Sequence, residues 1–212
     1  MKKNIIIGVM VVVIASLSFL VYQNINKKEV LDNNKQDNDI LFEDSKEDLS
    51  ADELDELESF INKIENNAFI LIDYSNPKDI LTIDNVDVLR YSINSSNFSR
   101  NANDNERKVI WNGYDAGVST RVSSTDDLRL YMEEKTNYQV SFEEIKNAFS
   151  QYYNKELDLY YYLISDTLFE SHKIVSGYRL DNKIYITLDD NSDVVLIYDN
   201  DKYYFYSCDK NN

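Results

Sequence analysis

The stretch "KIYITLDDNSDVVLIYDNDKYYFYSC", residues 183–208, sets the expectation for the fold. It contains three runs of β-branched and aromatic residues that read with a period of two, which is typical of half-buried strands. Only short polar segments, 189–192 and 200–201, separate these runs. Because connections this short join antiparallel neighbours, we predict a C-terminal β-meander.

Two further runs, 157–164 ("LDLYYYLI") and 172–180 ("HKIVSGYRL"), extend the pattern upstream to five predicted strands. Alternation places Tyr160 and Tyr162 on the face opposite the leucines, and it turns Tyr185 away from its isoleucine neighbours. One face of the sheet is therefore expected to be aliphatic and the other aromatic. An aromatic stripe at strand spacing is an ordinary product of β-packing, but it can also form a tyrosine-lined surface for a glycan or peptide.

Helices are predicted before the meander, which makes the class α+β. Three N-terminal capping signals precede apolar residues at helical spacing. They predict helices at 51–65, 126–135 and 142–153. We expect these helices to cover the sheet.

The remaining part of the domain gives weaker signals. Apolar runs at 68–74 and 86–93 are predicted as strands. The polar stretch 94–124 is predicted to be a flexible insertion with a small hairpin around its Asn-Gly pair. Trp111 precedes that pair, where it can stack on a sugar or anchor a partner, although a sole tryptophan can equally serve in packing.

The N-terminus carries a membrane signal. Two lysines precede an uncharged apolar run, 5–22, whose eighteen residues span about 27 Å as a helix. We predict that residues 1–28 form an uncleaved signal-anchor with a cytoplasmic N-terminus. The acidic segment 29–48 lacks periodicity and is predicted to be a flexible linker, and 49–212 is predicted to be an extracytoplasmic domain.

Charge and residue counts exclude several functions. From Glu29 onward the chain carries 18 basic and 38 acidic residues, a net charge of −20, so nucleic-acid binding is disfavoured. A single cysteine, Cys208, and a single histidine, His172, leave no intramolecular disulfide and no multi-histidine zinc site. No cofactor is predicted. No metal is predicted either, because the segment 189–200, which is similar to a calcium-binding loop, lacks the glycine and the terminal glutamate of such loops.

Three stretches resemble an uncharacterised family of secreted or membrane-tethered proteins of low-GC Gram-positive bacteria. They are "LSADELDELESFINKIENNAFILIDYSNPKDI", "LRLYMEEKTNYQVSFEEIKNAF" and "YYYLISDTLFESHKIVSGYRLDNKIYITL". The resemblance covers about residues 49–208 and implies no known activity. The chain departs from the family by lacking an N-terminal lipoprotein cysteine and histidines near "YYYLISDT", so no histidine-based site carries over.

Taken together, these features predict a non-catalytic binding module for an envelope polysaccharide or a protein partner. The candidate ligand-binding residues are Tyr160, Tyr162, Tyr185 and Trp111. One alternative is a carboxylate-based hydrolase of cell-wall glycan, although no acid pair is selected by its spacing. Another alternative is a sensor or accessory ectodomain that uses the 94–124 insertion as its contact.

The membrane anchor is directly testable. The full-length protein is expected to stay in the membrane pellet after alkaline carbonate extraction, because the uncharged run 5–22 remains in lipid. Val12→Arg places a charge at the centre of that run, at a cost of about 3 kcal/mol for insertion, and should move part of the protein out of the pellet. A mature protein in the medium that begins beyond Ser18 would contradict the prediction.

Overall fold

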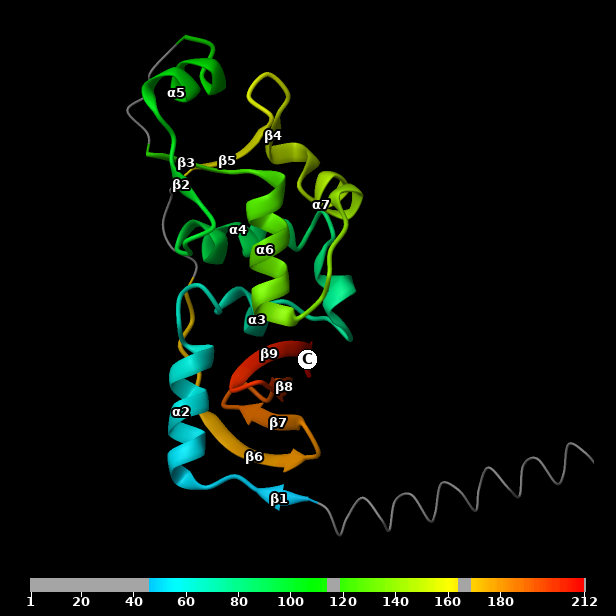
Figure 1. The fold of residues 1–212 in the computed structure, drawn as a ribbon. Helices are drawn as coiled ribbons and strands as arrows, with labels where there is room; N and C mark the ends of the chain where they lie inside the picture. The colour runs from blue at the N-terminus through cyan, green and yellow to red at the C-terminus, as the bar shows by residue number, and fades with distance from the viewer. Residues whose placement is uncertain (1–45, 114–118, 164–168, 212) are drawn as a thin grey trace, which may run out of the picture. The chain divides into compact units, whose positions relative to one another are not determined.

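A computed structural model describes residues 46–113, 119–163 and 169–211, and the chain from Glu47 onward belongs to one compact unit (Figure 1). The predicted membrane segment 1–28 lies outside the described residues, as does the predicted linker up to residue 45. Among the residues that are described, no helix is both long enough and apolar enough to cross a membrane.

The described residues are α+β with antiparallel sheets, as predicted. The elements in chain order are β1 (Glu47–Asp48), α2 (Ala51–Ile61), α3 (Ala68–Leu71), η1 (Pro77–Ile80), α4 (Val86–Asn94), β2 (Arg100–Asn101), α5 (Asp104–Ile110), β3 (Thr120–Ser123), α6 (Thr125–Thr136), α7 (Phe142–Ala148), η2 (Ser150–Tyr152), β4 (Tyr153–Asn154), β5 (Leu159–Leu163), β6 (Ile174–Leu180), β7 (Lys183–Leu188), β8 (Asp193–Asp199) and β9 (Lys202–Asp209).

The predicted meander is confirmed for four of its five strands. The larger sheet has the order β1-β6-β7-β8-β9, and every neighbouring pair in it is antiparallel. The prediction for β5 is wrong, because this strand belongs to a second sheet with the order β2-β3-β5-β4. The connection from β5 to β6 is much longer than a tight turn, so it does not force the two strands to pair.

The predicted capping boxes are present in the structure. Ser50 pairs reciprocally with Glu53 at the start of α2, and Ser141 pairs with Glu144 at the start of α7. At α6 the cap is Ser124, whose partner is Asp127. In each case the side chains satisfy backbone N–H groups that the first helical turn leaves without partners, so these helices begin where the sequence predicts.

Two predicted strands are helices instead. The run at 68–74 contains the four-residue helix α3, and only Tyr74 forms a β-bridge, with Cys208. A short run that is apolar on all sides does not distinguish a buried helix from a buried strand. The run at 86–93 forms α4, in which Val86, Leu89 and Ile93 are buried at helical spacing.

The stretch 94–124 is more ordered than predicted, within its described residues. Strands β2 and β3 pair antiparallel, and α5 lies between them in the chain with its own capping box. Arg100 forms two hydrogen bonds, of 2.8 and 2.6 Å, with the carboxylate of Glu106. The Arg100 guanidinium holds the pKa of Glu106 below its usual value. The hairpin predicted around Asn112 and Gly113 is wrong, because helix α5 and not a strand leads into this pair, although both residues have the positive φ angles of a turn.

An aromatic cluster joins the larger sheet to three helices. Phe205 of β9 stacks on Phe69 of α3, with 4.9 Å between ring centroids, and on Phe60 of α2, with 5.3 Å. Phe69 contacts Tyr131 of α6 at 5.9 Å. A bulge in the β8–β9 pairing lets Phe205 and Cys208, three residues apart, both face the core.

We expect Phe205→Ala to lower the free energy of unfolding by about 3–5 kcal/mol, because it leaves a cavity between two aromatic rings. Tyr204→Ala is the matched control, since Tyr204 is the half-buried neighbour on the same strand, and its cost should be about 1 kcal/mol. Urea denaturation of both variants measures the difference. Equal losses would show that Phe205 is not central to the core.

Candidate functional site

The three tyrosines predicted as ligand-binding residues do not form one surface. Tyr160 and Tyr162 of β5 are each 0% exposed, and they pack against Phe149 and Tyr152 in the core. Burial raises the pKa of Tyr162 well above its ordinary value. The prediction that Tyr160 and Tyr162 share one face of β5 is confirmed, but this face is covered by other elements and is not a free surface.

Tyr185 lies on the other sheet, on its outer face. Its ring stacks on Tyr178 of β6 with 4.8 Å between centroids and an interplanar angle of 8°. The pair borders a groove of 260 Å³ that includes Ser176 and Asp193. Tyr185 is half-buried, so the outer face of the larger sheet corresponds to the partly solvent-exposed aromatic face that the sequence predicts.

Trp111 follows the end of α5 and is half-buried. Its indole Nε1 donates a hydrogen bond of 3.4 Å to Oγ1 of Thr120 on β3. This contact ties the end of α5 to the smaller sheet. Trp111 lies on different elements from Tyr160, Tyr162 and Tyr185, so the structure does not collect the four predicted residues into one site.

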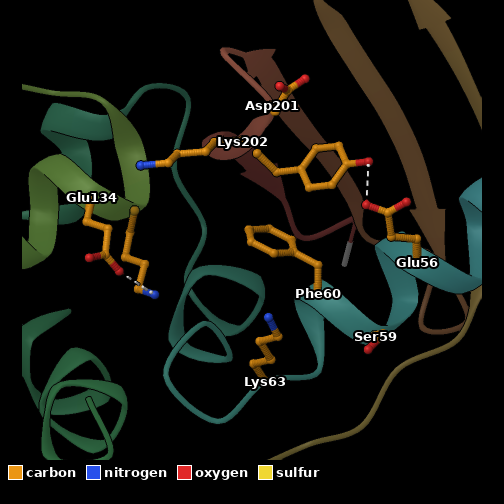
Figure 2. Close-up of a pocket in the computed structure, with 9 residues that line it drawn as sticks. Glu56, Ser59, Phe60, Lys63, Glu134, Asp201 and Lys202 are labelled. Atoms are coloured by element: carbon orange, nitrogen blue, oxygen red, sulfur yellow. Dashed lines mark hydrogen bonds and ion pairs between the residues drawn. The ribbon is translucent and has the colours of Figure 1, made fainter. Parts of the chain in front are cut away.

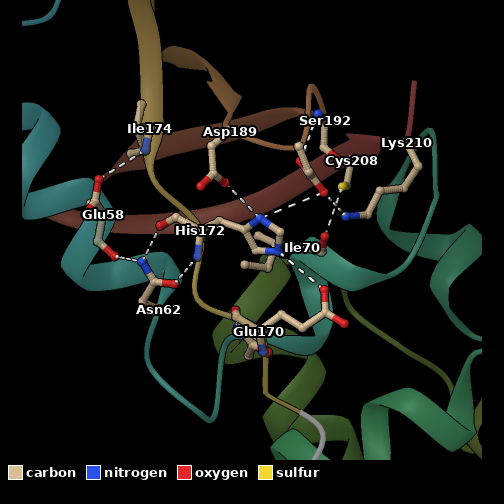
Figure 3. Close-up of polar contacts among 12 residues, drawn as sticks. Glu58, Asn62, Ile70, Glu170, His172, Ile174, Asp189, Ser192, Cys208 and Lys210 are labelled. Carbon is tan, nitrogen blue, oxygen red and sulfur yellow. Dashed lines mark hydrogen bonds and ion pairs between the residues drawn. The ribbon is translucent and has the colours of Figure 1, made fainter. Parts of the chain in front are cut away.

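Cys208 is buried, and its thiol has the features of an unreactive cysteine. The thiol is 0% exposed, and its Sγ donates a hydrogen bond of 3.8 Å to the carbonyl oxygen of Ile70 (Figure 3). Burial raises the pKa of this thiol to about 12. Because the thiolate is the nucleophilic form, Cys208 has the properties of a packing residue and not of a catalytic one.

His172 precedes β6 in the chain and is only 7% exposed. Its Nδ1 lies 3.2 Å from Oδ1 of Asp189, whereas its Nε2 is buried without a hydrogen-bond partner (Figure 3). The nearest carboxylate oxygen to Nε2, from Glu170, is 3.7 Å away. Within the ranges 46–113, 119–163 and 169–211, no group of three or more acidic, histidine or cysteine side chains is placed to hold a metal ion.

Amide side chains fix the backbone around His172. Asn62 accepts a hydrogen bond of 2.9 Å from the His172 N–H and donates one of 2.8 Å to its carbonyl oxygen. Asn67 pairs with the backbone of Glu170 in the same way, at 3.1 and 2.8 Å. Two residues further on, the Ile174 N–H donates to Glu58. Alternate residues of one extended segment are thus held by side chains, so this polar network is structural.

The first part of the calcium-like segment, residues 189–192, forms the tight connection between β7 and β8, and the rest of it is β8 itself. Asp190 accepts hydrogen bonds of 3.0 Å from the Ser192 N–H and from the ammonium of Lys210. Although burial acts in the opposite direction, the hydrogen bonds from Ser192 and Lys210 lower the pKa of Asp190 to about 2. These oxygens stabilise the hairpin turn, which agrees with the turn predicted there.

A hollow lies where α2, the last turn of α6 and the β8–β9 turn meet (Figure 2). Its volume is 470 Å³. The lining combines two aromatic rings with three ammonium and three carboxylate groups, from Glu56, Ser59, Phe60, Lys63, Glu134, Lys135, Asp201, Lys202 and Tyr203. We call it the α2–β9 cavity.

Several polar groups of the α2–β9 cavity already have partners. The Tyr203 hydroxyl donates a hydrogen bond of 3.1 Å to Glu56, and burial together with this bond raises the pKa of Tyr203 to about 12. Lys135 pairs with Glu134 at 3.1 Å. Among the described side chains, by contrast, none forms an ion pair with Lys63 or Lys202. The cavity therefore offers two free ammonium groups beside an aromatic wall.

Sequence reasoning missed this cavity because its walls come from segments far apart in the chain. Phe60 is visible beside the apolar stripe of α2, and the polar pair 200–201 marks the tight turn. Neither signal shows that the two segments meet. Their contact depends on the stacking of Phe60 on Phe205, which is a tertiary interaction.

No family model, curated protein or solved structure matches the chain.

The reactivity of the Cys208 thiol can be measured. Cys208 should not react with a thiol reagent in the native protein and should react fully in urea, because the thiol is buried and protonated. Ser207→Cys adds a half-exposed thiol one residue away and should react without denaturant, which controls for the reagent. Rapid modification of native Cys208 would contradict its assignment as a packing residue.

Proposed function

We propose that residues 47–212 form a non-catalytic binding module whose ligand site is the α2–β9 cavity. The observation that carries this proposal is the 470 Å³ hollow in which Phe60 and Tyr203 stand beside the free ammonium groups of Lys63 and Lys202. Cavities of about 300–1,000 Å³ with an apolar wall and a few polar groups are typical of ligand sites.

The setting that we propose is the cell envelope. The apolar run 5–22 would anchor the chain in the membrane and hold the acidic domain outside the cytoplasm, where an envelope polysaccharide or a protein partner is the accessible ligand. The resemblance to membrane-tethered proteins of low-GC Gram-positive bacteria stays a prediction that is consistent with this setting. A sensor or accessory ectodomain would use the same cavity for its ligand.

Glycan hydrolysis is the second candidate, because three carboxylates line the same cavity. A general acid must stay protonated, which requires a carboxyl group removed from water. Glu134 is instead 52% exposed and paired with Lys135. Glu56 and Asp201 already accept hydrogen bonds from the hydroxyls of Tyr203 and Tyr198, so neither carboxyl group is held ready for a substrate alone. Binding therefore has better support than hydrolysis.

A blocking substitution tests the site. Ser59 is exposed on α2 and lines the cavity, so Ser59→Trp should fill the hollow without disturbing the core. We expect full-length protein in detergent to bind purified cell-envelope material in a sedimentation assay, and Ser59→Trp to weaken that binding about tenfold or more.

Ser176→Trp is the matched control, because Ser176 is equally exposed but lies beside the Tyr178–Tyr185 pair. Its binding should be unchanged. If Ser176→Trp abolished binding and Ser59→Trp did not, the site would be the tyrosine face, and the assignment to the α2–β9 cavity would be wrong. Release of soluble sugars from the material would instead favour the hydrolase.

A further inference from the structure

The geometry of the α2–β9 cavity points to a specific class of ligand. We infer that it binds an acidic sugar unit of a glycan, a hydroxyl-rich ring that carries one anionic group. This inference rests on the proposed function, because it assumes that the cavity is the ligand site. It follows from three sets of groups in the lining, which are the free ammoniums, the carboxylates and the aromatic rings.

The ammonium groups select a negative charge. The chain from Glu29 onward has a net charge of −20, yet three lysines line this one hollow, and Figure 2 labels two of them, Lys63 and Lys202. Lys135 is neutralised by Glu134, which leaves Lys63 and Lys202 to interact with a ligand. Lys63 also follows the C-terminus of α2, where a cation is favourable in itself. Lys202 has no such role, and its ammonium remains available for charge-assisted hydrogen bonds to an anion.

The carboxylates select hydroxyl donors. The carboxylate oxygens of Glu56 and Asp201 are hydrogen-bond acceptors, and a carboxylate has about four lone-pair sites. Each of them accepts one tyrosine hydroxyl, at 3.1 Å in both cases, so lone pairs remain for ligand O–H groups. A second anionic group on the same sugar ring would be repelled here. The sugar unit that satisfies these acceptors together with the ammoniums carries several hydroxyls and one charge.

The aromatic rings select a flat, partly apolar surface. Phe60 and Tyr203 are 5.4 Å apart between centroids and inclined at 54°, so they form an angled wall and not a closed stack. Phe60 is held from behind by Phe205, and Tyr203 is held by Glu56, which fixes both rings before a ligand arrives. The C–H face of a sugar ring packs against such a wall, while its hydroxyls reach the polar rim.

Three probes of matched length separate the ligand classes. They are an oligogalacturonate, its neutral methyl ester and an oligoglutamate, each titrated into the full-length protein in detergent by calorimetry. We expect the oligogalacturonate to bind about tenfold or more tightly than its ester, and we expect high salt to reduce that difference. The oligoglutamate should bind no better than the ester, because a peptide lacks the hydroxyl donors.

Charge-neutral variants assign the effect to residues. Lys63→Gln with Lys202→Gln should abolish the preference for the acid, whereas Lys146→Gln with Lys155→Gln, both exposed and outside the cavity, should preserve it. Equal binding of acid and ester, blocked by Ser59→Trp, would overturn the anion requirement and leave the cavity as a ligand site. Tight binding of oligoglutamate would identify an acidic peptide as the ligand instead.

Absence of binding by every probe would also overturn the inference. The proposed function would still stand in that case if Ser59→Trp weakened binding to envelope material. The two assays therefore fail independently.

Discussion

The stacking of Phe205 between Phe60 and Phe69 is the interaction on which the rest of the domain depends. These three rings connect β9 to α2 and α3, and Tyr131 extends the contact to α6. The hydroxyl of Tyr131 donates to the carbonyl oxygen of Glu65, so the buried ring also holds the segment between α2 and α3. Sheet and helices share one core because this cluster crosses the boundary between them.

The α2–β9 cavity depends on the same aromatic packing around Phe205. Phe60 faces the core with one side of its ring and the hollow with the other, so the element that stabilises the domain also forms the wall of the site (Figure 2). The opposite side of α2 is fixed by Glu58 and Asn62, which hold the segment leading into β6. With contacts on two sides, α2 is a rigid support for the side chains that line the cavity.

Local signals in the sequence were sufficient for four strands of the meander and for the starts of α2, α6 and α7, but the capping box of α5 was not recognised. They failed where a segment is apolar on all sides, as at α3, and where pairing is decided far away in the chain, as for β5 with β3. The tyrosines of β5 illustrate the limit. Alternation predicts which side chains share a face, but only tertiary packing determines that Tyr160 and Tyr162 lie inside and Tyr185 outside.

The turn between β8 and β9 has left-handed backbone at both Asn200 and Asp201, with φ angles of 50° and 59°. Such a turn matches the twist of its strands and closes the hairpin with no spare residue. The same two-residue turn carries Asp201 and leads directly into Lys202 at the cavity rim. Substitutions in this exposed turn therefore change the rim of the cavity and leave the buried core intact, whereas a change at Phe60 affects the cavity and the core together.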